Sequence, residues 1–321
     1  MSLFTALKSV VKRLPIIEDI VLERDKLRRE CGYYPPGHFY SPIPSWEEIK
    51  RDQAKIFGDM PRNIPGIELH ESEQLKLLED FRQYYESMPF QPHKVEGLRY
   101  YFENPAYSYS DAIFLHCMIR HLKPKRLIEI GSGFSSCVAL DTNEIFLNGS
   151  IRTIFIDPDP DLLISLIKED DRGKIEVIPQ RLQEVGVSMF EALEAGDILF
   201  IDSTHVSKIN SDVNRIFFDI LPAVSPGVYI HFHDVFFPFE YPKESIDDGL
   251  AWNEAYMLRS FLQYNGDFRV VLMNTFMEHF HEPFFREKMP LCLNNRGGSI
   301  WIRKGHIELI SALGGASAPR R

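Results

Sequence analysis

The segment that most constrains the fold is residues 126–140, which read RLIEIGSGFSSCVAL. An apolar run up to Ile130 meets two glycines, Gly131 and Gly133, and continues as a small-residue segment compatible with a helix. This order predicts a strand, a tight turn and a helix. Glycines let the backbone approach a ligand closely, and the first turn of a helix offers N–H groups without partners. The sequence therefore predicts a nucleotide-like cofactor at this turn.

The chain after residue 150 alternates between predicted strands and predicted helices. Apolar runs typical of buried strands occur at residues 153–156, 175–178, 198–201, 228–232, 268–274 and 299–303. Helical patterns lie between several of them, at residues 161–167, 190–193 and 211–221. Such alternation is typical of a parallel sheet with helices on both faces. The sequence therefore predicts a doubly wound α/β domain.

A helical and loop-rich extension precedes this domain. Helical periodicity is present at residues 1–14, 16–29 and 72–88, whereas residues 33–65 are rich in proline, glycine and aromatics without a period. The first of these helices has basic residues opposite its apolar side, a pattern that also occurs in helices lying on membranes. We expect residues 1–95 to act as a lid or as a contact in a homodimer, before an α/β domain at residues 96–310. Residues 311–321 have the composition of a disordered tail.

Composition narrows the kinds of partner. A net charge of −10 and a pI near 5.6 argue against binding nucleic acid through phosphate neutralisation, so a small molecule is the expected ligand. The 4 cysteines form no CxxC pair, which argues against a zinc site or a disulfide framework. No apolar run approaches the ~20 residues of a membrane span, and the first residues lack a signal-peptide pattern. We therefore expect a cytoplasmic protein.

Acidic and histidine residues follow the predicted strands, where ligands of parallel sheets bind. They are Glu129, Asp157, Asp202, His205, His233 and Asp234. Asp157 follows the glycine turn at roughly the ~20 residues expected for an acid that accepts hydrogen bonds from ribose hydroxyls. The turn departs from the GxGxxG pattern at Ser136, which disfavours a pyrophosphate-containing dinucleotide but not a cofactor without pyrophosphate.

Four motifs together give the chain a family resemblance. Residues 109–304 resemble the class I S-adenosylmethionine-dependent methyltransferases, of the bacterial type with EIGSGFSS, FIDPDP, FIDSTH and HFHDVFFPFEYP. The resemblance implies a Rossmann-like seven-stranded sheet whose last strand, at residues 299–303, is antiparallel. It implies that Glu129 faces the methionine amino group, that the glycine turn lines the methionyl and ribose parts, and that Asp157 binds the ribose. The cofactor-binding residues predicted in this way are Glu129, Gly131, Ser132, Gly133, Asp157 and Asp202.

A second group of residues, Asp202, His205, His233 and Asp234, points to the chemistry. Methyl transfer to oxygen requires removal of the hydroxyl proton, and a divalent cation held by carboxylates can lower the pKa of that hydroxyl. Metal-dependent O-methyltransferases of the catechol and macrolide-sugar types place acids after the same two strands, which here gives Asp202 and Asp234 as ligands of magnesium or manganese. The match is partial, because Val235 stands where a third acid is expected.

Two other interpretations of the same residues stay open. His233 or His205 can act as a general base beside Asp202, because an imidazole titrates near neutral pH. Alternatively, the acids only cap loops and the histidines fill the core. The aromatic run at residues 236–241 fits an acceptor pocket, with a packing plug as the other interpretation.

The predicted function is methylation of a hydroxyl on a small-molecule or saccharide acceptor. One alternative is a nicotinamide-dependent oxidoreductase on a similar sheet, which Ser136 disfavours. The other is a non-catalytic binding or scaffold protein that retains the fold.

Overall fold

The computed structural model describes residues 15–30 and 32–305, and the chain divides into two compact units. One unit contains residues 1–60 and 243–251, and the other contains residues 61–242 and 252–321. The first boundary between the units thus follows residue 60, whereas the extension was expected to end at residue 95. A short later segment, residues 243–251, also belongs to the first unit. The helix predicted at residues 1–14 and the tail predicted at residues 311–321 lie outside the described residues.

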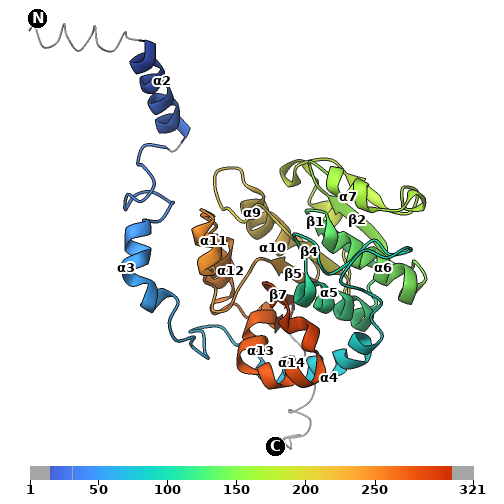
Figure 1. Cartoon of the computed structure of the whole chain (residues 1–321). Helices are drawn as coiled ribbons and strands as arrows, with labels where there is room; N and C mark the ends of the chain where they lie inside the picture. Colours follow the sequence, from blue (N-terminus) through green and yellow to red (C-terminus); the bar gives the residue numbers. More distant parts are fainter. Residues whose placement is uncertain (1–14, 31, 306–321) are drawn as a thin grey trace, which may run out of the picture. The chain divides into compact units, whose positions relative to one another are not determined.

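The described part of the first unit is helical and loop-rich, as expected. It contains α2 (Pro15–Glu30), α3 (Trp46–Ile56) and α11 (Lys243–Asp247), the first two drawn in blue in Figure 1. Ser45 begins α3 by accepting a hydrogen bond from the Glu48 N–H at 3.4 Å. Before α3, the ring of Tyr34 stacks on His38 with centroids 4.4 Å apart. No helix among the described residues is long and apolar enough to cross a membrane. The roles as lid and dimer contact stay predictions.

The second unit is built on a seven-stranded sheet with the strand order β3-β2-β1-β4-β5-β7-β6. Its strands are β1 (Arg126–Ile130), β2 (Arg152–Ile156), β3 (Glu176–Ile178), β4 (Ile198–Ile201), β5 (Tyr229–His233), β6 (Phe268–Met273) and β7 (Ser299–Lys304). The first five strands pair in parallel, and β7 runs antiparallel to both β5 and β6. This confirms the predicted Rossmann-like sheet with an antiparallel last strand.

Helices lie on both faces of this sheet (Figure 1). Phe232 of β5 packs on Phe217 of η3 (Ile216–Ile220) with ring centroids 5.6 Å apart, whereas the preceding residue, His231, points to the other face and stacks on Phe200 of β4 at 4.1 Å. The helices of the unit are α4 (Glu71–Glu86), α5 (Tyr109–Leu122), α6 (Phe134–Leu147), α7 (Asp161–Leu166), η1 (Glu169–Asp171), η2 (Leu182–Glu184), α8 (Ser188–Glu191), α9 (Asp212–Arg215), η3 (Ile216–Ile220), α10 (Leu221–Ala223), α12 (Glu254–Leu262), α13 (Asn274–Phe280), α14 (Glu282–Lys288) and η4 (Pro290–Leu293). The helix predicted at residues 211–221 is therefore interrupted, because η3 is a π-helical turn.

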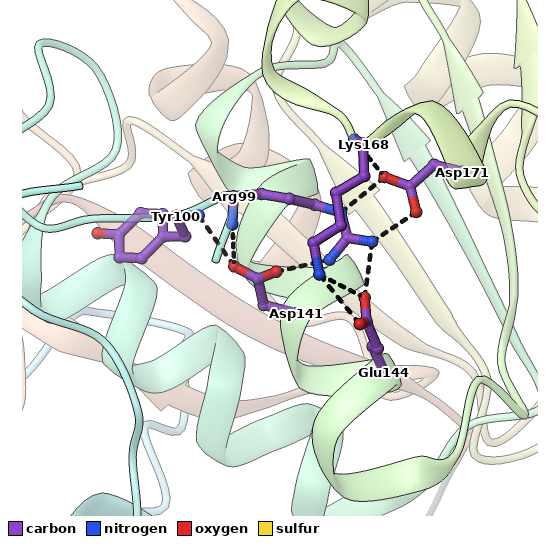
Figure 2. Close-up of polar contacts among 6 residues, drawn as sticks. All are labelled: Arg99, Tyr100, Asp141, Glu144, Lys168 and Asp171. Carbon is purple, nitrogen blue, oxygen red and sulfur yellow. Dashed lines mark hydrogen bonds and ion pairs between the residues drawn. The ribbon is translucent and has the colours of Figure 1, made fainter. Parts of the chain in front are cut away.

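A buried ion cluster fixes the segment before α5 to α6. Arg99 is 3% exposed and donates to Asp141 at 2.6 Å and to Asp171 at 2.7 Å (Figure 2). Asp141, on α6, also accepts the backbone N–H groups of Arg99 and Tyr100, each at 2.9 Å. Glu144 pairs with both Arg99 and Lys168 at the rim of the cluster. Each buried charge therefore has an opposite charge and a hydrogen bond, as burial requires.

Candidate functional site

The glycine turn lies between β1 and α6, at the carboxyl end of the sheet. Gly131 has φ +83°, and a Cβ there would lie 2.4 Å from the backbone carbonyl oxygen of Asp202. Only glycine fits, because a side chain would meet both left-handed strain and a backbone clash. Ser136, the residue that departs from GxGxxG, accepts a hydrogen bond from the Gly133 N–H at 3.1 Å. The Ser136 hydroxyl, in the first turn of α6, thus satisfies the backbone N–H of the residue that precedes the helix.

Two carboxyl groups flank the turn. Glu129 is 1% exposed and accepts a hydrogen bond from Ser135, and burial raises its pKa to about 8. Asp157 accepts the Ser132 hydroxyl at 2.7 Å and the Asp159 N–H at 2.9 Å. A carboxylate has further lone pairs beyond these two bonds, so Asp157 can still accept ribose hydroxyls. The residues present therefore fit the cofactor implied by the resemblance, whose ammonium group would offset the burial of Glu129.

His205 lies among three carboxyl groups. Its Nε2 is 3.3 Å from Asp202 Oδ1 and 3.6 Å from Asp234 Oδ2, and its Nδ1 is 2.9 Å from Glu254 Oε2. The backbone carbonyl of His205 also accepts the Glu254 N–H at 3.1 Å, which ties the loop to the start of α12. His205 and Asp234 both have left-handed backbones, with φ 58° and 55°. Such strain at non-glycine residues is typical of functional sites.

The charge state of His205 follows from these neighbours. Burial alone would lower its pKa, but the hydrogen bonds to Asp202 and Glu254 outweigh burial and raise the pKa to about 10. Burial raises the pKa of Glu254, and its bond to His205 opposes that shift. Burial also acts to raise the pKa of Asp202, yet His233 and His205 lower it overall. His205 is therefore an imidazolium at neutral pH, paired with the carboxylate of Asp202.

His233, the last residue of β5, is the second imidazole of the site. Its side chain is 9% exposed, and its Nε2 lies 3.8 Å from Asp234 Oδ1. Burial acts to lower its pKa, and Asp234, Asp202 and Asp111 raise it overall. Its Nδ1 is buried and has no hydrogen-bond partner among the described residues, so Nε2 is the ring nitrogen that faces a carboxylate. The ring of Tyr107 packs on His233 with centroids 5.1 Å apart.

The position of Tyr107 depends on the ion cluster described above. Tyr100, held by Asp141, donates its hydroxyl to the Tyr107 carbonyl at 2.8 Å. The Tyr107 hydroxyl in turn donates to the Asp111 carbonyl at 3.1 Å. The tyrosine beside His233 is therefore fixed at both its backbone and its hydroxyl.

The sequence predicts Asp202 and Asp234 as the ligands of a divalent cation. His205 Nε2 stands within 4 Å of both carboxylates, so a positive charge of the protein already lies between them. Among residues 15–30 and 32–305, no group of three or more His, Cys, Asp or Glu side chains is arranged to hold a metal ion. The described residues in this arrangement therefore do not fit a divalent cation. No step of the proposed reaction uses a metal.

Two features of the site differ from what the sequence suggests. The aromatic run at residues 236–241 was expected to face an acceptor, but Phe237, Phe239 and Tyr241 are each at most 3% exposed. They are packing residues, which favours the packing plug over the acceptor pocket for this part of the run. Glu254, which holds His205, had no predicted role. It follows the histidine by 49 residues and belongs to no motif, so only the packing of α12 reveals it.

The sequence resembles a known domain family and a protein of another organism. Residues 128–235 match a family model described as a methyltransferase domain. A protein of Archaeoglobus fulgidus, described as uncharacterized, is 38% identical over 188 residues, which cover 56% of this chain and 82% of that protein.

Solved structures of methyltransferases also resemble the chain. The SAH-bound methyltransferase PaMTH1 of Podospora anserina is 14% identical, with a TM-score of 0.41 over 81% of this chain and 97% of that chain. The O-methyltransferase TomG of Streptomyces achromogenes, in complex with SAM, is 13% identical, with a TM-score of 0.42 over 72% and 90%. Because both scores are below 0.5, the fold assignment rests on the strand order itself. Residues 128–235 therefore belong to a methyltransferase domain, which is built on a seven-stranded sheet whose last strand is antiparallel.

Proposed function

We propose that this methyltransferase acts on oxygen, transferring a methyl group to a hydroxyl of a small-molecule or saccharide acceptor. The observation that carries the proposal is the joint position of His233, Asp234, Asp202 and His205 beyond β4 and β5, next to the glycine turn. A hydroxyl is a weak nucleophile until its proton is removed, and this group of residues combines a base with a fixed positive charge. An acceptor atom that is already nucleophilic, such as a neutral amine nitrogen, would need neither the base nor the positive charge.

His233 is the proposed general base. Its Nε2 lies 3.8 Å from Asp234 Oδ1, so that carboxylate can stabilise the imidazolium that forms. His205 is unsuited to this role at neutral pH, because its pKa of about 10 keeps it protonated. The ring of Tyr107 limits the rotation of His233 and so keeps Nε2 directed toward the acceptor.

His205 is the proposed electrostatic partner of the reacting oxygen. Its protonated Nε2, between Asp202 and Asp234, orients both carboxylates and offsets their repulsion of a developing alkoxide. Glu254 fixes the ring from the opposite side through Nδ1. Trp252, whose ring centroid is 4.5 Å from that of His205, offers a half-buried face for the acceptor.

The cofactor supplies an electrophilic methyl group on a sulfonium. In the proposed reaction the acceptor O–H bond breaks and its proton goes to His233 Nε2, while the oxygen forms a bond to the methyl carbon. The carbon–sulfur bond breaks with its electron pair left on sulfur. The products are a methyl ether and S-adenosylhomocysteine, and the proton on His233 returns to solvent.

Release of S-adenosylhomocysteine from a panel of hydroxyl, amine and thiol acceptors tests the proposal. We expect turnover with hydroxyl acceptors, and His233→Gln should lower kcat by about 10²- to 10⁴-fold while leaving the affinity for S-adenosylhomocysteine unchanged. His279→Gln, an exposed histidine on α13, is the matched control. Turnover only with amines or thiols would refute O-methylation. Activity lost on chelation and restored by magnesium or manganese would refute the role of His205 as the site's cation.

A further inference from the structure

Two arginines stand directly opposite each other where β6 pairs with β7. Arg269 and Arg303 are Cα partners in the antiparallel register, so their side chains leave the same face of the sheet. Like charges in this arrangement repel and destabilise the pair unless an opposite charge lies between them. Neither guanidinium forms an ion pair within the described chain, and the buried Arg303 Nε has no hydrogen-bond partner. An anion between the two guanidinium groups would offset this repulsion and could accept a hydrogen bond from Arg303 Nε.

A third positive charge faces the same place. Lys76 of α4 lines, together with both arginines, a cavity of about 200 Å³. The ring of Tyr229 lies 5.5 Å from the Arg303 guanidinium and supports it from one side. Glu73 and Asp80 also line the cavity, but both side chains are exposed and neither forms an ion pair with the three cations. The cavity therefore has one positive charge in excess, in a chain whose net charge is −10.

The walls of this cavity are held in place without a ligand. Gln74, two residues before Lys76 on α4, accepts the Met273 N–H of β6 at 2.8 Å and is itself fully buried. Helix and edge strand are thus fixed to each other, which lowers the ordering cost of binding. The cavity adjoins Tyr229, the first residue of β5, whereas His233 is the last, about 13 Å away at the rise of a strand. A ligand here is therefore separate from the methyl-transfer site.

We propose that Arg269, Arg303 and Lys76 bind the phosphate group of a small phosphorylated molecule at the end of the sheet opposite the methyl-transfer site. Two guanidinium groups present paired N–H donors that match phosphate oxygens, and a lysine adds a mobile point charge. A phosphate between the two arginines replaces their repulsion by attraction and supplies a partner for Arg303 Nε. The proposal does not depend on the identity of the methyl acceptor.

Titration of the full chain with inorganic phosphate, followed by calorimetry and by thermal melting at low ionic strength, tests this site. We expect saturable binding that raises the melting temperature, and Arg269→Gln or Arg303→Gln should weaken it at least about tenfold, since one charge-assisted hydrogen bond is worth that much. Without phosphate, Arg269→Gln should melt no lower than the parent chain, because one of two opposed charges is removed. Arg82→Gln, on the same helix but paired with Glu79, is the matched control and should bind phosphate normally.

Two outcomes would overturn the proposal. One is the absence of saturable phosphate binding to a chain that still binds S-adenosylhomocysteine. The other is binding that both arginine substitutions leave unchanged, which would place the anion elsewhere, for example at the glycine turn. Affinity for S-adenosylhomocysteine, measured on each variant, shows that the fold and the cofactor site remain intact.

Discussion

Replacing Glu254 with glutamine removes one charge from the group around His205 and keeps the shape of the side chain. Glu254 Oε2 lies 2.9 Å from Nδ1, with the two side chains 1% and 7% exposed. Raising the pKa of His205 from 6.5 to about 10 corresponds to roughly 5 kcal/mol, at 1.36 kcal/mol per unit. Asp202 and Glu254 share this energy, so we expect Glu254→Gln to lower the free energy of unfolding by about 2 kcal/mol at neutral pH.

The pH dependence of this loss identifies its cause. Because the folded pKa of His205 lies above the unfolded value, its stabilisation is complete below pH 6.5 and disappears as pH rises toward 10. The difference between the parent chain and Glu254→Gln, measured by urea unfolding, should therefore shrink over this interval. Glu184→Gln, at an exposed pair with Arg181, should show a small difference that does not vary with pH. A Glu254→Gln difference that stays constant from pH 6.5 to 10 would refute an imidazolium at His205.

Three further predictions concern the cofactor turn. Because the pKa of Glu129 is about 8, binding of a ligand ammonium near neutral pH should release the Glu129 proton. Calorimetry of S-adenosylhomocysteine binding in buffers of different ionisation enthalpy measures this proton release. Glu129→Gln should abolish the proton release. Gly131→Ala should destroy cofactor binding, whereas Gly149→Ala, also at positive φ but with nothing within 4 Å, should cost only about 1–2 kcal/mol in thermal unfolding. Asp157→Ala should weaken S-adenosylhomocysteine binding at least about tenfold in the same calorimetric assay, with Asp159→Ala as the control.

The fold could be predicted from the sequence because its strands are buried on both faces. Strands β1, β2, β4 and β5 therefore appear as short apolar runs, and polar residues at or after their ends mark the carboxyl end of the sheet. The helix that contains η3 was predicted as continuous, because a π-helical turn changes the hydrogen bonding but not the apolar pattern. The strands were predicted more accurately than this helix because burial on both faces leaves a clear apolar run in the sequence.

The chemistry of the site was less accessible to sequence reasoning. His205 and Asp202 are three residues apart, so their proximity could be expected, but the charge of His205 depends on Glu254 from a distant helix. The composition of the aromatic run after Asp234 fits both a pocket wall and a packing plug, and only the burial of its side chains favours the plug. Local patterns identify which residues end strands, whereas pKa values depend on everything packed around them.

The ion cluster around Arg99 has a consequence for the way this molecule opens. The amide hydrogens of Arg99 and Tyr100 are bonded to the Asp141 carboxylate rather than to a neighbouring strand or helix turn. Opening the segment alone would leave the buried carboxylates of Asp141 on α6 and Asp171 on η1 without partners, which is costly. These two amides should therefore exchange with deuterium as slowly as the core of α6, so that a stretch without helix or strand structure belongs to the most stable cooperative unit of the domain.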